Sequence, residues 1–441
     1  MKREIKNSID FEIHGGKKLS GSIRTGYSKN GSVGLLCASL LNRGKTTLHG
    51  IARIEEVNRI VEILESIGVK IAWIGTNTIE INPPKKFNLK NLNKDSAIKT
   101  RSILMFIGPL VHYFSSFNIP HAHGCSLGKR TIAAHSYALE ELGINIEVTK
   151  NDYRIKHRKL TPAEIIMYEA GDTPAENILT ASALIPGKTI IKFASSNYQV
   201  QEICFFLQKC GIKIEGIGTS TLIIYGVKNI NKNIEYYNSE DPIESMTLIT
   251  AGISTDSTLT ITRAPINFLE LELYKLKKMG LKFKIGKTYK AENKETNLVD
   301  ITVYPSKLSA LDDKIHANPY PGINMDNLPY FVISAIKAKG QTLIHDWTYE
   351  KRAIYLTELN KMGANTILKD PHRLYVKGGT ILKPADITCP PALRPSMVIL
   401  LAMLGAKGTS ILRNVYMINR GYEEIAKRLN SVGADIKIIK N

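Results

Sequence analysis

The sequence of 441 residues predicts an α/β protein made of two similar domains, because one helix–turn–strand pattern returns along it six times. Each copy is an amphipathic helical stretch, then a glycine, then a strand of alternating apolar residues, as in ILESIGVKIAWI and LNSVGADIKI. Gly directly after the last apolar helical position is the usual helix C-terminal cap, because it adopts the left-handed conformation at little cost. The six glycines are Gly68, Gly143, Gly211, Gly280, Gly363 and Gly433.

A second pattern alternates with the first and predicts turns from an apolar helix into a strand, as in RGKTTLHG, PGKTIIKF and KGTSILRN. Two of these turns contain Gly-Lys-Thr, which suggests a phosphate-binding P-loop. That motif needs another Gly five positions before the first of these glycines, where Ser39 and Ser182 stand. We therefore interpret both as structural turns.

The units fall into two groups of three, separated by a polar stretch at 227–242. Six α/β units grouped in this way predict two domains, with helices packed inside curved sheets. A cleft between two such domains is a common place for a ligand.

Composition restricts the function classes. The first 16 residues contain no apolar core of signal-peptide length, and no apolar run approaches the roughly 20 residues that span a bilayer. Five scattered cysteines do not form a disulfide framework and suit a reducing cytosol. The net charge of +19 comes from evenly spread Lys, so charge alone favours no partner strongly.

Polar clusters outside the repeats are candidates for chemistry. Each has a structural alternative: Asn30 and Asp326 could cap helices, and each Arg could form a surface ion pair worth less than about 1 kcal/mol. If the two halves face each other, however, the basic residues would converge on a cleft suited to phosphates or a carboxylate. The clusters are GYSKNG (26–31), KTRS (99–102), PHAHGCSLGKR (120–130), INMDNLP (323–329), YEKRAIY (349–355) and NRGYEE (419–424), with Arg394 as an addition.

The stretch 120–130 allows two interpretations. Cys125 lies between Gly124 and Gly128 with Lys129 and Arg130 beside it, an environment that favours a reactive thiolate. Alternatively, His121, His123 and Cys125, with the later His135, offer zinc-type ligands. No Cys-x-x-Cys or His-x-x-x-His pair accompanies them, so we favour the thiol.

Together these motifs resemble the UDP-N-acetylglucosamine enolpyruvyltransferase (1-carboxyvinyltransferase) family of the EPSP synthase-like superfamily. The likeness lies in Ser28-Lys29-Asn30, TRSILMFIGPLV, GCSLGKR, HANPYPGINMDN and INRGYEEIAKRLNSVGADI. It implies two inside-out α/β barrel domains of three βαβαββ units each, with no cofactor and no metal. Because the N-terminal strand of the family crosses over, the first domain would span 21–238, and the second would comprise 1–20 and 239–441.

The resemblance also implies an activity: transfer of the enolpyruvyl group of phosphoenolpyruvate to the 3-hydroxyl of UDP-N-acetylglucosamine, with release of phosphate. Cys125 would protonate C3 and capture phosphoenolpyruvate covalently, and Asp326 would act as base near the sugar hydroxyl. Lys29, Arg130 and Arg420 would bind phosphate and carboxylate. The other implied substrate-binding residues are Asn30, Arg101, His135, Arg352 and Arg394.

The same resemblance implies a cytoplasmic enzyme of peptidoglycan synthesis, a monomer or weak homo-oligomer without nucleic-acid or membrane partners. Fosfomycin, an epoxide that alkylates the loop cysteine of the family, would then modify Cys125.

The sequence departs from the family pattern on the uridine side. Glu169 stands where a Lys is expected, Thr131-Ile132-Ala133 replace Pro-x-Asp, and Ala392 replaces an Asp. The acceptor could therefore be a different nucleotide or nucleotide sugar. Two other classes stay open: a metal-binding protein, and an RNA 3′-end enzyme, since RNA 3′-phosphate cyclases share related repeats and the chain is basic.

Overall fold

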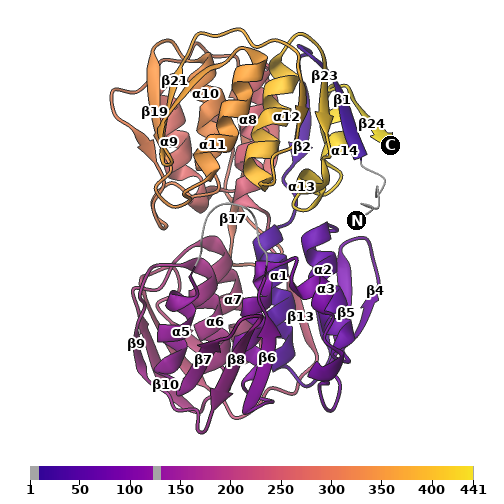
Figure 1. The fold of residues 1–441 in the computed structure, drawn as a ribbon, viewed down its shortest axis with the longest axis vertical. Coiled ribbons are helices and arrows are strands. Elements are labelled where there is room, and N and C mark those ends of the chain that lie inside the picture. Colours follow the sequence, from indigo (N-terminus) through magenta and orange to yellow (C-terminus); the bar gives the residue numbers. More distant parts are fainter. Residues whose placement is uncertain (1–8, 123–130, 441) are drawn as a thin grey trace.

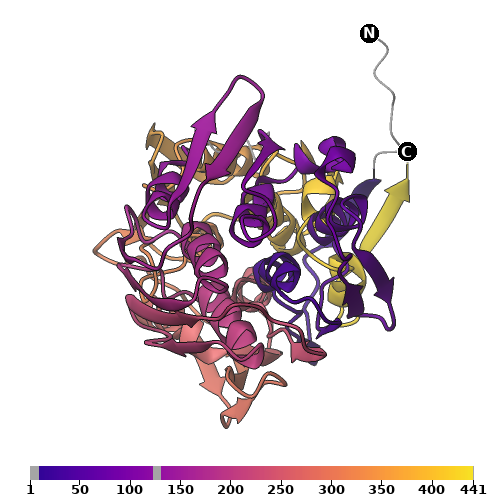
Figure 2. The same cartoon turned by 90° about the horizontal axis from the view of Figure 1, so that it is seen from below.

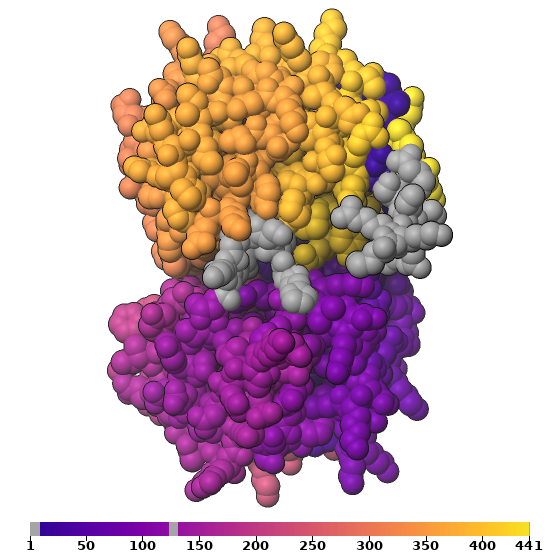
Figure 3. Space-filling view, in the orientation of Figure 1, coloured from indigo at the N-terminus to yellow at the C-terminus, as the bar shows by residue number. Residues whose placement is uncertain are grey.

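The computed structural model describes residues 9–122 and 131–440. In this part of the chain, helices and six small sheets, five mixed and one antiparallel, form two lobes along the long axis of the molecule (Figure 1). In the space-filling view the two lobes meet face to face (Figure 3). The predicted α/β class is confirmed, and the six sheets are consistent with six repeated units.

The repeating unit is clearest in the sheet with strand order β11-β12-β10-β9. Along the chain it runs strand, helix, strand, helix, strand, strand; β9 and β10 are parallel, and the other pairs are antiparallel. Its elements are β9 (Glu164–Ile166), α6 (Asp172–Ser182), β10 (Gly187–Lys192), α7 (Tyr198–Lys209), β11 (Lys213–Glu215) and β12 (Thr221–Gly226).

The helix-ending glycines behave as predicted. All six have positive φ, between 81° and 105°, the left-handed region that a C-terminal cap requires.

The rest of the first lobe contains two further sheets, ordered β13-β3-β5-β4 and β6-β8-β7. Their strands are β3 (Thr46–His49), β4 (Lys70–Trp73), β5 (Thr78–Asn82), β6 (Ser116–Pro120), β7 (Ile144–Val148), β8 (Asp152–His157) and β13 (Ile234–Tyr237). The helices are α1 (Lys29–Ala38), α2 (Glu55–Ser66), α3 (Lys94–Ala97), α4 (Ile107–Leu110) and α5 (Ala133–Glu140), with short 3₁₀ turns at Ser39–Leu41, Leu89–Asn91 and Arg101–Phe106.

The second lobe has sheets ordered β15-β17-β14-β2, β18-β19-β21-β20 and β22-β23-β1-β24. The strands are β1 (Ile9–Gly15), β2 (Ser22–Arg24), β14 (Leu259–Pro265), β15 (Lys282–Ile285), β16 (Tyr289–Lys290), β17 (Asn297–Tyr304), β18 (Ile315–His316), β19 (Gln341–His345), β20 (Asn365–Asp370), β21 (Arg373–Lys377), β22 (Asp386–Thr388), β23 (Gly408–Arg413) and β24 (Ile436–Lys440). The helices are α8 (Pro242–Ser254), α9 (Glu270–Lys278), α10 (Phe331–Lys337), α11 (Arg352–Leu356), α12 (Leu393–Gly405), α13 (Tyr416–Asn419) and α14 (Ile425–Asn430), with 3₁₀ turns at Ile266–Phe268, Leu328–Tyr330 and Thr357–Met362.

The buried helices lie inside and the sheets outside. Every residue of α8 is buried, as is α12 from Arg394 to Leu404, and both helices contact α10. Seen from below, helices of the first lobe likewise lie within a ring of strands (Figure 2). The finer description as two inside-out barrels remains our interpretation of this arrangement.

Two N-terminal strands belong to sheets of the second lobe. β1 lies between β23 and β24, antiparallel to both, and β2 pairs in parallel with β14. Because β2 comes after residue 21, we propose that the chain crosses between the domains at 25–28.

The return crossing lies at 238–241, directly after β13. Strand β13 pairs with β3 and lies inside the polar stretch 227–242, which the sequence predicts as the break between the two domains. The two crossings run side by side in opposite directions. The Ser28 amide donates to the Ser239 carbonyl at 2.8 Å, and the Asp241 amide donates to the Gly26 carbonyl at 2.9 Å. Hydrophobic residues cluster separately on either side of these crossings. This separation supports the proposed two-domain organisation.

Replacing Ile13 with Ala tests whether the crossed N-terminal strand stabilises the second lobe. Ile13 is 0% exposed and lies between Ser410 and Ile436, so its loss should cost about 2–5 kcal/mol in urea unfolding. Ile438 in β24 of the same sheet is 56% exposed, and its replacement by Ala is the matched control. Equal effects of the two substitutions would contradict a buried role for β1.

Candidate active site

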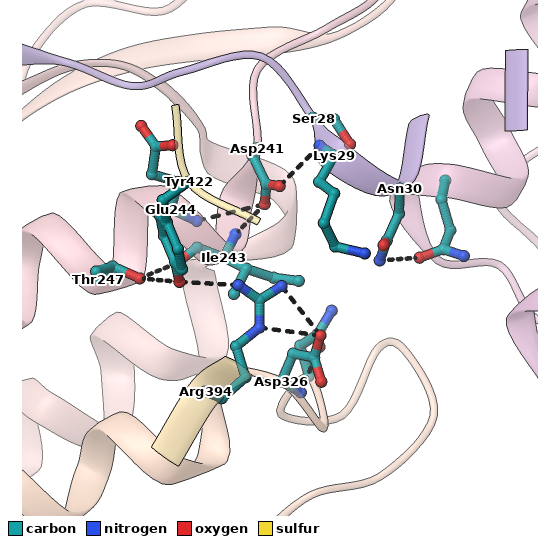
Figure 4. Close-up of polar contacts among 12 residues, drawn as sticks. Ser28, Lys29, Asn30, Asp241, Ile243, Glu244, Thr247, Asp326, Arg394 and Tyr422 are labelled. Atoms are coloured by element: carbon teal, nitrogen blue, oxygen red, sulfur yellow. Dashed lines mark hydrogen bonds and ion pairs between the residues drawn. The ribbon is translucent and has the colours of Figure 1, made fainter. Parts of the chain in front are cut away.

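The first turn of α1 lies where the chain enters the first lobe, and its position is set by two side chains (Figure 4). Ser28 is the N-terminal cap: its hydroxyl accepts a hydrogen bond from the Gly31 amide at 2.9 Å. The Lys29 amide donates to Asp241 Oδ2 at 3.1 Å. The other oxygen of Asp241 caps α8 by accepting from the amides of Ile243 at 2.8 Å and Glu244 at 3.3 Å. One carboxylate thus connects the first turns of two helices, one from each lobe.

Asn30 is not a helix cap. Its side-chain amide donates to Tyr198 Oη at 2.9 Å and to Gln199 Oε1 at 2.8 Å, both at the start of α7. Asn30 therefore faces the neighbouring helix inside the first lobe, beside Lys29.

Lys29 is half-buried between charged groups from both lobes. Burial has the largest effect and lowers the pKa of the Lys29 amine. The carboxylates of Glu56 and Asp326 raise this pKa, whereas Arg394 and Arg420 lower it, and the net shift is downward. The amine therefore lies at the meeting point of four charged side chains.

Asp326 is also not a helix cap; it accepts hydrogen bonds from buried Arg394 (Figure 4) and forms an ion pair with buried Arg352. Arg394 reaches Asp326 Oδ2 with Nε at 3.2 Å and Nη2 at 3.1 Å, and Arg352 Nη1 lies 3.5 Å from Oδ1. Burial raises the pKa of Asp326, but Arg394, Arg352 and Lys29 bring it below its usual range. The carboxylate is therefore ionised and strongly held.

Further hydrogen bonds fix the orientation of Arg352 and Arg394. Asp346 binds Arg352 through Nε at 2.5 Å and Nη2 at 2.9 Å, and Arg394 Nη1 donates to Tyr422 Oη at 2.8 Å. Arg352 and Arg394 are only 1% and 5% exposed, so the alternative of surface ion pairs is wrong for them. Their orientation toward the cleft is fixed before any ligand binds.

Arg420 of the second lobe pairs with Glu56 of the first. Arg420 Nε donates to Glu56 Oε2 at 2.5 Å, and the Glu56 amide donates to the Arg420 carbonyl at 3.3 Å. Sequence analysis did not single out Glu56, because an acid in the first turn of a helix is ordinary. Only the structure sets Glu56 apart, because it is buried on an otherwise amphipathic helix.

Two other expected residues make contacts within the first lobe. Arg101 Nη2 donates to the Thr131 carbonyl at 2.9 Å. His135, 3% exposed, lies within hydrogen-bonding distance of the Asn177 amide, with 3.2 Å between Nδ1 and Nδ2. Burial, assisted by Arg101, lowers the pKa of His135 to about 3, so its ring is neutral. Its burial favours a structural role.

The helix α6 carries two carboxyl groups that sequence analysis missed, Asp172 and Glu176. Ser195 Oγ and Asn197 Nδ2 donate to Asp172 at 2.5 Å and 2.9 Å, and Gln199 Nε2 donates to Glu176 at 3.3 Å. Burial raises the pKa of both, that of Glu176 well above its usual range. Glu169 and Thr131, two of the departures from the family pattern, are exposed, and Ala133 is half-buried.

The predicted Cys125 and Arg130, together with His123 and Lys129, lie outside the described residues. His121 is described: its ring packs against Tyr153 with 4.3 Å between centroids. Within 9–122 and 131–440, no three His, Cys, Asp or Glu side chains gather closely enough to hold a metal ion. No helix of those same residues is long and apolar enough to cross a membrane.

Lys29, Arg352 and Arg394 lie around the carboxylate of Asp326, and Arg420 binds Glu56, which also acts on Lys29. Such a set of cations defines the class of the protein as one that binds a small substrate with anionic groups. A family profile described as EPSP synthase (3-phosphoshikimate 1-carboxyvinyltransferase) matches residues 13–429.

Curated relatives extend over the whole length. The chain is 32% identical to the UDP-N-acetylglucosamine 1-carboxyvinyltransferase of Bradyrhizobium diazoefficiens, covering 97% of this chain and 98% of the relative. It is also 32% identical to the protein of the same name from Campylobacter hominis, covering 97% and 99%.

Among solved structures, the enolpyruvyl transferase NikO from Streptomyces tendae has a TM-score of 0.85 at 23% identity, covering 99% of this chain and 100% of that one. At this identity the likeness shows the fold alone. The sequence matches show more: this chain belongs to the enolpyruvyl transferase family of EPSP synthase and UDP-N-acetylglucosamine 1-carboxyvinyltransferase, and its class of reaction is enolpyruvyl transfer from phosphoenolpyruvate.

A substitution of His135 tests its structural role through acid stability. Its folded pKa of about 3 lies below the unfolded value of about 6.5, so its contribution to stability is complete above pH 6.5 and is lost as pH falls toward 3. His135→Gln, which cannot titrate, should reduce the slope of unfolding free energy against pH in this window by up to about 1.4 kcal/mol per pH unit. Urea unfolding between pH 6.5 and 4 measures the slope; an unchanged slope would contradict the buried neutral ring.

Proposed function

We propose that the protein transfers the enolpyruvyl group of phosphoenolpyruvate to the 3-hydroxyl of UDP-N-acetylglucosamine and releases phosphate. The observation that carries this proposal is the placement of Lys29, Arg352 and Arg394 around Asp326. The full-length similarity to curated 1-carboxyvinyltransferases supports the acceptor. The family assignment favours neither a metal-binding protein nor an RNA 3′-end enzyme.

The reaction needs a proton at one carbon and a nucleophile at the next. Protonation of C3 of phosphoenolpyruvate makes C2 electrophilic, and the acceptor oxygen then bonds to C2 as its proton leaves. Loss of a C3 proton and of phosphate from the resulting ketal restores the double bond. In this proposal Asp326 takes the acceptor proton, and Cys125, in the sequence stretch outside the described residues, supplies the proton to C3.

The cations have separate tasks. Arg352 and Arg394, held by Asp346 and Tyr422, are placed to take a carboxylate with fixed geometry. Lys29 and Arg420, with Arg130 of the sequence motif, would bind the phosphate as it becomes the leaving group. Asn30 would orient the sugar, and Arg101 would act on the nucleotide side. Asp326 is released from its arginines only when another anion takes its place.

In this proposal the enzyme acts in the cytoplasm in peptidoglycan precursor synthesis. Phosphoenolpyruvate and a nucleotide sugar would be its small-molecule substrates.

Phosphate release tests the proposal. We expect release from phosphoenolpyruvate only with UDP-N-acetylglucosamine present, and at least a ~100-fold loss in Cys125→Ala, since general acid catalysis contributes about that much. Fosfomycin should add its mass to the wild type but not to the alanine variant. Release with shikimate 3-phosphate and not with the sugar nucleotide would contradict the acceptor assignment.

A second candidate is transfer to a different nucleotide or nucleotide sugar. It is favoured by Glu169, an exposed carboxylate where the family pattern has Lys, and by the two buried carboxyl groups of α6. A carboxylate beside a diphosphate is repulsive, whereas a neutral hydroxyl or amide tolerates it.

Glu169→Lys distinguishes the two acceptors. If UDP-N-acetylglucosamine is the acceptor, the added cation should lower its KM by about tenfold, while kcat changes little, because the contact is outside the reacting atoms. Glu164→Lys, an equal charge change at an exposed position of β9 where the carboxylate pairs with Lys192, is the control. An equal effect of both substitutions on KM would indicate general electrostatic attraction of the nucleotide. A loss of activity of E169K with UDP-N-acetylglucosamine, together with faster turnover of a different nucleotide acceptor tested beside it, would support the second candidate.

A further inference from the structure

Glu56 is a buried carboxylate with no role in the reaction as proposed above. It lies in the first turn of α2, 4% exposed, and no polar group of its own helix explains its burial. Thr100 Oγ1 donates to Oε1 at 2.5 Å and Ser102 Oγ lies 3.4 Å from the same oxygen, while Arg420 Nε binds Oε2. Two hydroxyls of the first lobe thus hold one oxygen and present the other to the second lobe.

The second cation near Glu56 is Lys29. The charged groups that act on its amine come from four elements: Glu56 from α2, Asp326 from the turn before Leu328–Tyr330, Arg394 from α12 and Arg420 from the end of α13. Glu176 of α6 also lies close enough for Lys29 to act on it. Two arginines and burial therefore disfavour the protonated form of the Lys29 amine. Nearby carboxylates must favour this form if the amine is to stay charged.

The other carboxylates are poorly suited to this task. Asp326 already accepts from Arg394 and lies against Arg352, and Asp241 accepts from the Lys29 backbone amide rather than from its amine. Burial raises the pKa of Glu176 well above its usual range and so favours its neutral form. The pKa of Glu56, in contrast, is lowered despite burial, because Arg420 and Lys29 favour its ionised form.

We propose that Glu56 is a positioning residue that holds the Lys29 ammonium and the Arg420 guanidinium together, as a charged pair spanning the two lobes. This inference rests on the proposed function, in which these two cations bind the phosphate of phosphoenolpyruvate. Glu56 itself acts through them: it keeps Lys29 protonated at the pH of the reaction, and its contact with Arg420 exists only when the lobes lie together.

The electrostatic part can be measured without substrate, by competitive acetylation of Lys29 read by peptide mass spectrometry across pH 7 to 10.5. The neutral fraction of an amine rises about tenfold for each unit by which its pKa falls. We expect Glu56→Gln to raise the acetylation rate of Lys29 severalfold at pH 8, and Glu56→Asp, which keeps the charge, to stay near the wild type.

Glu55→Gln is the matched control. Glu55 is in the same first turn of α2, so its loss removes the same charge from the same helix end, but it pairs with Arg59 at 3.2 Å and not with the cleft. We expect its acetylation profile for Lys29 to coincide with that of the wild type.

The second measurement is the pH profile of kcat/KM for phosphoenolpyruvate. Since Lys29 is active in its protonated form, the alkaline limb should move to lower pH in Glu56→Gln and not in Glu55→Gln or Glu56→Asp. A variant that merely unfolds more easily would lose activity equally at all pH values at which it is folded, as circular dichroism would show.

Coinciding acetylation profiles of Glu56→Gln and Glu55→Gln would overturn the inference, whatever the activity. A wild type without phosphoenolpyruvate-dependent turnover would instead overturn the proposed function. A shifted acetylation profile in that case would still establish the electrostatic link between Glu56 and Lys29.

Discussion

The site depends on the balance of charge between two lobes that bury cations against each other. An unpaired buried charge costs several kcal/mol, and repulsion between like charges adds to that cost. The structure meets this constraint with anionic or polar partners for the arginines: Asp346 and Asp326 for Arg352, Tyr422 and Asp326 for Arg394, and Glu56 for Arg420. The partners also fix the orientation of the cations, so the requirements of stability and of ligand binding are met by the same contacts.

The crossing of the chain is what brings these charges together. Since β2 belongs to the second lobe and α1 to the first, Lys29 is placed immediately at the point where the chain passes between them. Asp241, at the return crossing, holds the first turn of α1 and that of α8 with one carboxylate. The contacts of Asp241 thus join the two lobes next to Lys29.

What could be predicted from the sequence follows from the range of the interactions. The helix-ending glycines, the α/β class and the repeated units depend on local conformational preferences, and the structure agrees with them. The family resemblance predicts a domain boundary at residue 21, and the pairing of β2 with β14 leads us to propose a crossing at 25–28. That pairing joins residues more than 230 apart in the chain, which no local pattern encodes. Lys29, Asp326, Arg352 and Arg394 were found because motifs carry them. Glu56, Asp172 and Glu176 were missed because their importance comes only from burial and from partners distant in sequence.

The carboxyl groups of the site differ in the form that their surroundings favour. Around Asp326 the carboxylate is kept ionised by Arg394 and Arg352, whereas Asp172 and Glu176 on α6 are pushed toward their neutral forms by burial. A neutral carboxyl group can donate a hydrogen bond as well as accept one. Asp172 and Glu176 bind Asn197 and Gln199 at the start of α7, and Gln199 in turn accepts from Asn30. The buried carboxyl groups of α6 therefore act first on the orientation of Asn30, the residue next to Lys29.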